Sequence, residues 1–292
     1  MLPNNCIFNG MKKWAYLLTI LLLFFAGCSS QQKTTIQYKK EDGVKPKKLS
    51  LDIYNNQPGR DKPVVVFVHG GGWILGDKAT KIKRKVALFK ELDYIFVSAN
   101  YRLSSFFNKK VQYPKHTIDV ADAIKWIFDS IDSYGGDKNK IVLLGHSAGA
   151  QMISLLVTSH KFLPERGISF DSFKGAISMD TEGYDVYGMC NAGAKIYQRN
   201  FGDDPEKWKE ASPILQLKPI GHYPDFLIVM RGKPYRIEMA NDFAAKLRAS
   251  DTKVKLINAD PYGHFKVNNI LGAKKDTIVT PAVVKFLKSH FN

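Results

Sequence analysis

Ser147 stands in a pattern that suits nucleophilic chemistry. It lies in Gly-His-Ser-Ala-Gly-Ala, residues 145–150, directly after the apolar run 141–144. A buried strand that turns sharply into a helix holds a serine on the strained turn between them, where its hydroxyl can attack a carbonyl carbon. Gly145 and Gly149 would then be small because the strand and helix backbones approach closely. From this pattern alone, a turn of small residues that happens to contain serine is the alternative interpretation.

A run of three glycines could supply the electrostatic part of the same chemistry. His-Gly-Gly-Gly-Trp follows the apolar run at 64–68, so main-chain N–H groups are left bare where a strand ends. N–H groups that converge on the oxygen of a tetrahedral intermediate stabilise its charge. We therefore expect Gly71 and Gly72 to form an oxyanion hole together with Ala148, the residue after the candidate nucleophile.

Strand-like and helix-like segments alternate along the chain and would position these groups. Apolar or alternating runs predict strands near 49–53, 64–68, 94–99, 141–144, 175–179, 226–230 and 254–258. Helical patterns lie at about 79–91, 117–131, 148–158, 236–249 and 281–291. This alternation predicts an α/β fold with a mostly parallel central sheet, helices on both faces and an antiparallel hairpin near residue 50. Ligand chemistry in such sheets gathers at the carboxyl ends of the strands.

Several linked motifs, in this order, resemble those of the α/β-hydrolase esterases. The segments HGGGWILGDK, ANYRLS, YGGDKNKIVLLGHSAGA and ASPILQL are similar to motifs of bacterial kynurenine-formamidase-like and feruloyl- or acetyl-esterase-like enzymes, and more distantly of the hormone-sensitive-lipase group. The resemblance runs from about residue 45 to the C-terminus. It implies an α/β-hydrolase fold with a minimal cap and Ser147 as the nucleophile.

The family order of serine, acid and histidine implies a general base near the C-terminus. His264 occupies that place, just after the predicted strand 254–258. The acid departs from the family pattern, because the segment after the penultimate strand carries Arg231 in place of the usual histidine and Tyr235 at the acid position.

Another carboxylate should therefore reach the histidine, because a carboxylate fixes the imidazole tautomer and stabilises the imidazolium. We expect Asp180, directly after the predicted strand 175–179, to take this role. Some lipases of this fold similarly carry the acid one strand earlier. Asp185 and Glu238 are the rivals, and a turn or helix-cap carboxylate is the alternative interpretation of Asp180.

The first residues resemble a bacterial lipoprotein signal. Lys12 and Lys13 precede an apolar run at 14–25, and Phe-Ala-Gly-Cys at 25–28 resembles the lipobox. The run is shorter than the roughly 20 residues that span a bilayer, which makes a retained transmembrane helix the weaker interpretation. The sequence predicts a signal peptide over 1–27, lipidation of Cys28, a tether over 28–40 and a hydrolase domain over 41–292. We expect membrane attachment through the lipid, at the bacterial cell envelope.

Composition narrows the possible partners. The chain has 292 residues with 43 Lys and Arg against 27 Asp and Glu, a net charge of +16. These cations are spread along the chain without a recognisable nucleic-acid module, so we expect a solvated basic surface and no nucleic-acid partner. No His, Cys, Asp or Glu cluster has ligand spacing, so we expect no metal and no cofactor. Cys190 is expected to have no disulfide partner.

These features predict a serine carboxylic ester hydrolase acting on short-acyl or aryl esters, either small molecules or groups linked to polysaccharide. An arylformamidase, another amidase or a peptidase of the same fold is the enzymatic alternative, since one triad can perform either chemistry. A catalytically silent envelope-binding domain is the alternative from another class, because no acid stands at the usual position.

Overall fold

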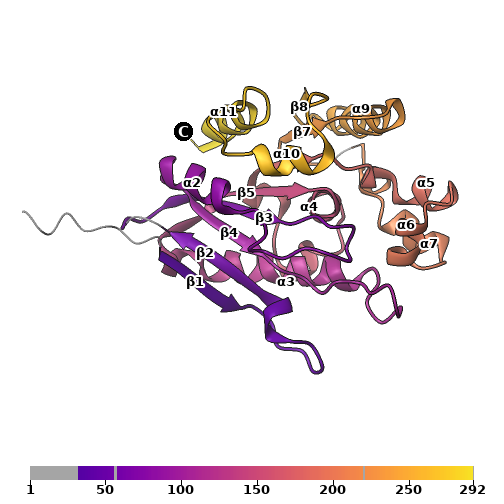
Figure 1. The fold of residues 1–292 in the computed structure, drawn as a ribbon, viewed down its shortest axis with the longest axis horizontal. Coiled ribbons are helices and arrows are strands. Elements are labelled where there is room, and N and C mark those ends of the chain that lie inside the picture. The colour runs from indigo at the N-terminus through magenta and orange to yellow at the C-terminus, as the bar shows by residue number, and fades with distance from the viewer. Residues whose placement is uncertain (1–31, 56–57, 220, 292) are drawn as a thin grey trace, which may run out of the picture.

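One mostly parallel sheet organises the protein. The computed structural model describes residues 32–55, 58–219 and 221–291, and in these ranges eight strands form a single sheet in the order β1-β2-β4-β3-β5-β6-β7-β8 (Figure 1). Strands β1, β2 and β4 pair antiparallel, and every other neighbouring pair is parallel. The strands are β1 (Gln32–Gln37), β2 (Ser50–Asn55), β3 (Lys62–Val68), β4 (Ile95–Ala99), β5 (Gly136–His146), β6 (Phe173–Met179), β7 (Phe226–Met230) and β8 (Val254–Asn258).

Two hydrophobic cores lie on the two faces of this sheet. Successive side chains of a strand point to opposite faces, so Val64, Val66 and Val68 join one core while Val65 and Phe67 join the other. In Figure 1, α2 and α11 lie on one side of the sheet and α3 lies on the other. The first core is covered by α3 (Lys115–Ser130), α4 (Ala148–Leu156) and α9 (Pro234–Arg248), and the second by α2 (Lys83–Glu91), α10 (His264–Ile270) and α11 (Val279–Phe291). The predicted α/β architecture is confirmed.

The folded domain begins earlier than predicted. Residues 32–37, assigned to the tether, form the edge strand β1, and the Thr35 hydroxyl donates to Asp52 Oδ1 at 2.7 Å. The tether prediction is wrong over this segment, because the β-branched residues Thr34, Thr35 and Ile36 favour a strand despite their polar neighbours. The predicted signal peptide and Cys28 lie outside the described residues. Within the described ranges, no helix has the length and apolar character needed to cross a membrane.

Between β6 and β7, the described residues form four short α-helices. Those labelled α5, α6 and α7 in Figure 1 lie beside the end of the sheet toward which β5 points. The ring of Trp73, from the glycine-rich loop, packs 5.3 Å from that of Tyr197 and 5.0 Å from that of Phe201. This insertion therefore covers the loop predicted to bind the oxyanion. The helices are α5 (Val186–Asn191), α6 (Lys195–Phe201), α7 (Pro205–Glu210) and α8 (Pro213–Gln216).

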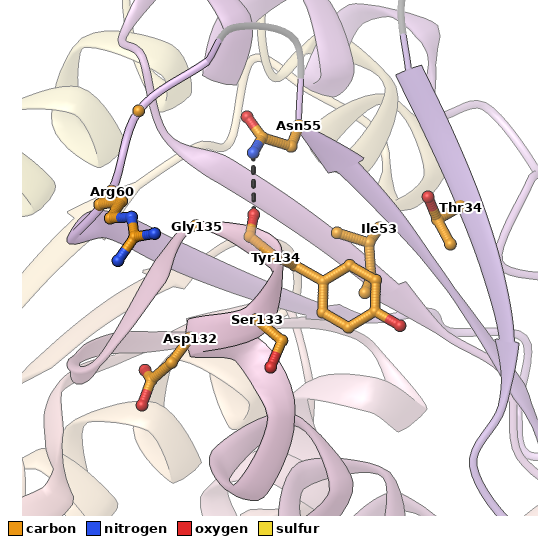
Figure 2. Close-up of a pocket in the computed structure, with 9 residues that line it drawn as sticks. Thr34, Ile53, Asn55, Arg60, Asp132, Ser133, Tyr134 and Gly135 are labelled. Atoms are coloured by element: carbon orange, nitrogen blue, oxygen red, sulfur yellow. Dashed lines mark hydrogen bonds between the residues drawn. The ribbon is translucent and has the colours of Figure 1, made fainter.

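A separate pocket of about 680 Å³ lies at the opposite, amino-terminal end of the parallel strands (Figure 2). Two of its lining residues are joined by a hydrogen bond, in which Asn55 at the end of β2 donates to the carbonyl of Tyr134 at 2.8 Å (Figure 2). Asp132 and Ser133 line it, but none of its described lining residues is a histidine. Among the described residues, this pocket therefore holds no histidine that could activate Ser133.

Candidate active site

Ser147 lies on a strained turn between β5 and α4. Its φ is +55°, a left-handed value that is uncommon for a residue with a side chain. A Cβ on Gly145 would lie 2.5 Å from the carbonyl oxygen of Gly149, and a Cβ on Gly149 would lie 2.1 Å from that of Val68. The close backbone approach predicted from the two glycines is confirmed. The turn keeps the serine side chain at the carboxyl end of the sheet.

Three side chains meet at this end of the sheet. Ser147 Oγ lies 3.0 Å from His264 Nε2, and His264 Nδ1 lies 2.7 Å from Asp180 Oδ2. An ionised carboxylate only accepts hydrogen bonds, so Nδ1 carries the imidazole proton and Nε2 is free to accept the serine O–H. Asp180 directly follows β6, and His264 opens α10 rather than lying in a loop. The structure thus places the three predicted residues in one hydrogen-bonded chain.

The rival carboxylates lie elsewhere. Asp185 is the N-cap of α5 and accepts a hydrogen bond from the main-chain N–H of Gly188 at 2.8 Å. Glu238 is exposed on α9 and does not line the pocket that contains Ser147. Of the three candidates, Asp180 reaches His264.

Two arginines hold the buried carboxylate of Asp180, which is 2% exposed. Arg236 donates from Nη2 to Asp180 Oδ1 at 2.6 Å and also pairs with Glu182, while Arg231 donates from Nη1 to Asp180 Oδ2 at 3.2 Å. Burial alone would raise the pKa of Asp180, but the hydrogen bond and charge of His264, followed by those of Arg236, lower it to about 2. Asp180 is therefore ionised at neutral pH. The sequence showed Arg231 only as a departure from the family pattern and left Arg236 without a role.

His146 contacts both the main chain and the ring of His264. Its Nε2 lies 3.0 Å from the carbonyl oxygen of His264, and the two rings are 4.7 Å apart. Burial, followed by the charge of His264, lowers the pKa of His146 to about 3, which keeps it neutral. A carbonyl only accepts, so His146 donates from Nε2 and fixes the main chain at His264. In the sequence, His146 is recognisable only as the residue before Ser147.

The far end of α10 is held by α2. Lys85 Nζ donates to the carbonyl of Asn268 at 2.7 Å, and Arg84 Nη1 donates to the carbonyl of Asn269 at 2.8 Å. Cations at the last carbonyls of a helix also interact favourably with its dipole. Lys85 is 1% exposed, and burial, followed by the charge of Arg84, lowers its pKa to about 7. These contacts fix the helix that begins at His264.

The glycine-rich loop has a backbone that needs glycine. Gly71 has a φ of +120°, Gly72 has a φ of +59°, and a Cβ on Gly71 would lie 2.1 Å from the carbonyl oxygen of Leu75. The Gly71 carbonyl accepts from the Leu75 N–H at 2.9 Å, and the Gly72 carbonyl accepts from Asn200 Nδ2 at 3.1 Å. In the described part of the chain, the N–H groups of Gly71 and Gly72 meet no carbonyl.

Ala148 opens α4, so its N–H has no partner within the helix. Gly72, Ser147 and Ala148 line the same pocket. This arrangement is compatible with the predicted oxyanion hole, and the roles of the three donors stay a prediction.

Two pockets meet at Ser147. One has a volume of about 410 Å³ and the other of about 550 Å³, and both are lined by Gly72, Ser147 and His264. The first contains Asp180 and its arginines. The second carries the apolar side chains of Leu75 and Phe265, which are 63% and 74% exposed. An ester bound at Ser147 could place its two halves in different surroundings.

His146, Asp180 and His264 also form a group with metal-ligand atoms within 4.8 Å of one another. No ligand spacing is visible for this group in the sequence, because the three residues come from distant segments. His264 Nδ1 already bonds Asp180, and His146 Nε2 already bonds the carbonyl of His264. A metal ion would have to replace these bonds, so we assign the group to positioning His264.

Comparison with known proteins assigns the chain to a family. The BD-FAE family model matches residues 51–230, and the chain belongs to that family. It is 28% identical over 81% of its length to esterase LipQ of Mycobacterium tuberculosis, and 30% identical over 83% to a probable isoprenylcysteine alpha-carbonyl methylesterase, ICMEL2, of Arabidopsis thaliana. The aligned region spans 58% of each of these curated relatives.

A solved structure confirms the fold. The hyperthermophilic esterase of the archaeon Pyrobaculum calidifontis superposes with a TM-score of 0.69 at 21% identity, covering 83% of this chain and 82% of that one. The α/β-hydrolase fold predicted from the motifs is therefore confirmed.

Proposed function

We propose that the protein is a serine carboxylic ester hydrolase in which Ser147 is the nucleophile, His264 the general base and Asp180 the acid. The observation that carries this proposal is the continuous chain of hydrogen bonds, 3.0 Å from Ser147 to His264 and 2.7 Å from His264 to Asp180. The strained turn at Ser147 and the esterase names of the family relatives support it.

The proposed reaction has two halves. Ser147 Oγ attacks the ester carbonyl carbon while its proton passes to His264 Nε2, and Asp180 stabilises the imidazolium. The N–H groups of Gly71, Gly72 and Ala148 stabilise the oxyanion, and His264 then protonates the departing alcohol. In the second half, His264 deprotonates a water molecule that attacks the acyl-enzyme and releases the acid. No cofactor takes part.

The proposed substrates are short-acyl or aryl esters, either small molecules or groups linked to polysaccharide. A pocket of about 410 Å³ accepts a group of that size beside Ser147. The short helices between β6 and β7 leave Ile196 39% exposed at the pocket, so the ester can approach from this side.

Hydrolysis of p-nitrophenyl acetate by the purified protein tests the proposal. The wild type should release p-nitrophenol, and Ser147→Ala should lose at least about 10⁴-fold in kcat while remaining folded by circular dichroism. Ser133→Ala is the matched control, because Ser133 is exposed in the distant pocket. Wild-type turnover by Ser147→Ala would contradict the proposal.

Matched amides separate the alternatives. We expect p-nitroacetanilide and N-formylaniline to react far more slowly than p-nitrophenyl acetate. Faster hydrolysis of either amide would favour the amidase or arylformamidase alternative. A folded wild type that hydrolyses none of these compounds would favour the silent binding domain.

A further inference from the structure

The pocket beside Asp180 is lined by more positive than negative side chains. Its cations are Arg231, Lys233 and Arg236, and its carboxylates are Asp180 and Glu182. Both terminal nitrogens of Arg236 are engaged, because one donates to Asp180 and the other pairs with Glu182, while its Nε is buried without a partner among the described residues. The positive excess therefore falls on the other two cations.

Arg231 and Lys233 keep donors that no described residue accepts. Among these residues Arg231 makes one hydrogen bond, from Nη1 to Asp180, and its side chain is 21% exposed. Lys233 is exposed at the pocket, and its ammonium has no ion pair or hydrogen bond to any described residue. A role in holding Asp180 explains Arg236 and part of Arg231, but it does not explain Lys233.

The other parts of this pocket are apolar or aromatic. Trp73, Ile196 and Tyr197 line it together with Tyr235, which is 44% exposed. The second pocket at Ser147 is lined by one lysine and one aspartate, Lys81 and Asp77, together with apolar side chains such as Leu75. Lys81 also makes no ion pair or hydrogen bond to a described residue, so the first pocket differs from the second by its excess of arginine and lysine over carboxylates.

We propose that the pocket beside Asp180 binds a carboxylate on the non-reacting part of the ester, with Lys233 and Arg231 as its ligands. The substrate class is an ester whose acyl or alcohol part is an organic acid, such as a dicarboxylic half-ester or an acylated acidic aromatic or sugar. Arg231 can donate two parallel hydrogen bonds to a carboxylate, and Lys233 adds a point charge. The chain carries 43 Lys and Arg residues against 27 Asp and Glu residues, and this positive net charge would also steer an anion to the protein. This inference rests on the proposed esterase function and deepens it.

Two pairs of esters test the inference. In the acyl pair, p-nitrophenyl hydrogen adipate is compared with p-nitrophenyl hexanoate, and in the alcohol pair, 4-acetoxybenzoate is compared with its methyl ester. At low salt, kcat/KM of the wild type should be about tenfold higher for the anionic member of at least one pair. The pair that shows the preference identifies which half of the ester lies against Lys233.

A lysine variant then assigns the preference. Lys233→Gln should lower the ratio of anionic to neutral kcat/KM about tenfold, mainly through KM, and 0.5 M NaCl should lower the wild-type ratio in the same direction. Lys207→Gln is the matched control, since Lys207 is exposed on α7 and lines neither pocket. It removes the same charge and should keep the wild-type ratio.

The outcomes separate this inference from the function on which it rests. Hydrolysis of the neutral esters without any anionic preference, or an equal loss of preference in Lys233→Gln and Lys207→Gln, would overturn the carboxylate site and leave the esterase intact. If the wild type hydrolysed none of the four esters, the proposed function itself would instead be overturned.

Discussion

Asp180 receives hydrogen bonds from His264, Arg236 and Arg231, although it lies one strand away from the position that the family motif predicts for the acid. The ends of β6 and β7 are neighbours in the sheet, so a carboxylate on either can reach a histidine that follows β8. In this chain, the position after β7 carries Arg231, which points back to the same carboxylate. In this chain the candidate acid thus follows β6, and the segment after β7 supplies a cation that contacts it.

Asp180→Asn should lower kcat about 10⁴-fold with little change in KM. The amide can donate to His264 Nδ1, which would leave the imidazole in the tautomer that cannot accept the serine proton. The measurement is steady-state hydrolysis of p-nitrophenyl acetate by purified variants. Asp185→Asn and Glu238→Gln serve as controls and should keep nearly wild-type turnover. A collapse of Glu238→Gln with active Asp180→Asn would show that the acid lies after β7 after all.

The sequence could indicate the residues of this site but not how they are supported. Ser147 was predicted from its pattern of small residues and His264 from the order of residues in the family that the motifs resemble. Asp180 was predicted because it directly follows a strand, and neighbouring strand ends offer similar reach. His146, Arg236 and Lys85 carried no comparable signal, because their contacts depend on the packing of α2, α9 and α10 against the sheet. A single histidine, arginine or lysine in a sequence is compatible with many surroundings.

At the scale of elements, long periodic segments were predicted well and short ones were missed. The expected strands and the helices α2, α3, α4, α9 and α11 are present, and most of their bounds lie within two residues of the predicted ones. The exceptions are β5, which begins at Gly136 rather than 141, and α2, which begins at Lys83 rather than 79. The helices α5 to α8 and α10 have four to seven residues, too few to show a 3.6-residue period. Strand β1 was missed because its polar composition matched a tether.

The contact between α2 and α10 makes Lys85 a positioning residue for His264. Lys85→Met should retain the apolar packing but lose the hydrogen bond to the carbonyl of Asn268, so α10 should become less well fixed. We expect a fall in kcat of about tenfold with a smaller change in KM. Arg60→Met is the control, because Arg60 is exposed near the opposite end of the sheet.

The lowered pKa of Lys85 also predicts that the stability of the protein depends on pH. Its pKa is about 7 in the folded protein and 10.5 by its ordinary value, so the unfolded chain binds more protons between these limits. The free energy of unfolding of the wild type should therefore gain up to about 1.4 kcal/mol per pH unit from this group as pH rises above 7. Lys85→Met should lack this gain in urea unfolding at pH 7 and pH 9. An identical pH dependence in both proteins would contradict the claim that the buried amine of Lys85 loses its proton readily in the folded protein.

At the scale of the whole molecule, the fold followed from the alternation of segments, but the attachment to a membrane still depends on sequence alone. We predict that the mature protein begins at a lipidated Cys28 and partitions with membranes. Cys28→Ser should block this processing. Intact-mass analysis of the mature wild type checks the prediction, and an unmodified chain that begins at another residue would contradict it.

The central claim is that Ser147 is an activated nucleophile, and labelling with a fluorophosphonate tests it most directly. Such a reagent reacts readily with a serine whose proton a neighbouring base can accept. We predict one adduct per wild-type chain, located on Ser147 by peptide mass spectrometry, with no adduct on Ser147→Ala and much slower labelling of His264→Ala. A folded wild type that stays unlabelled, or that carries the adduct on another serine, would contradict the account.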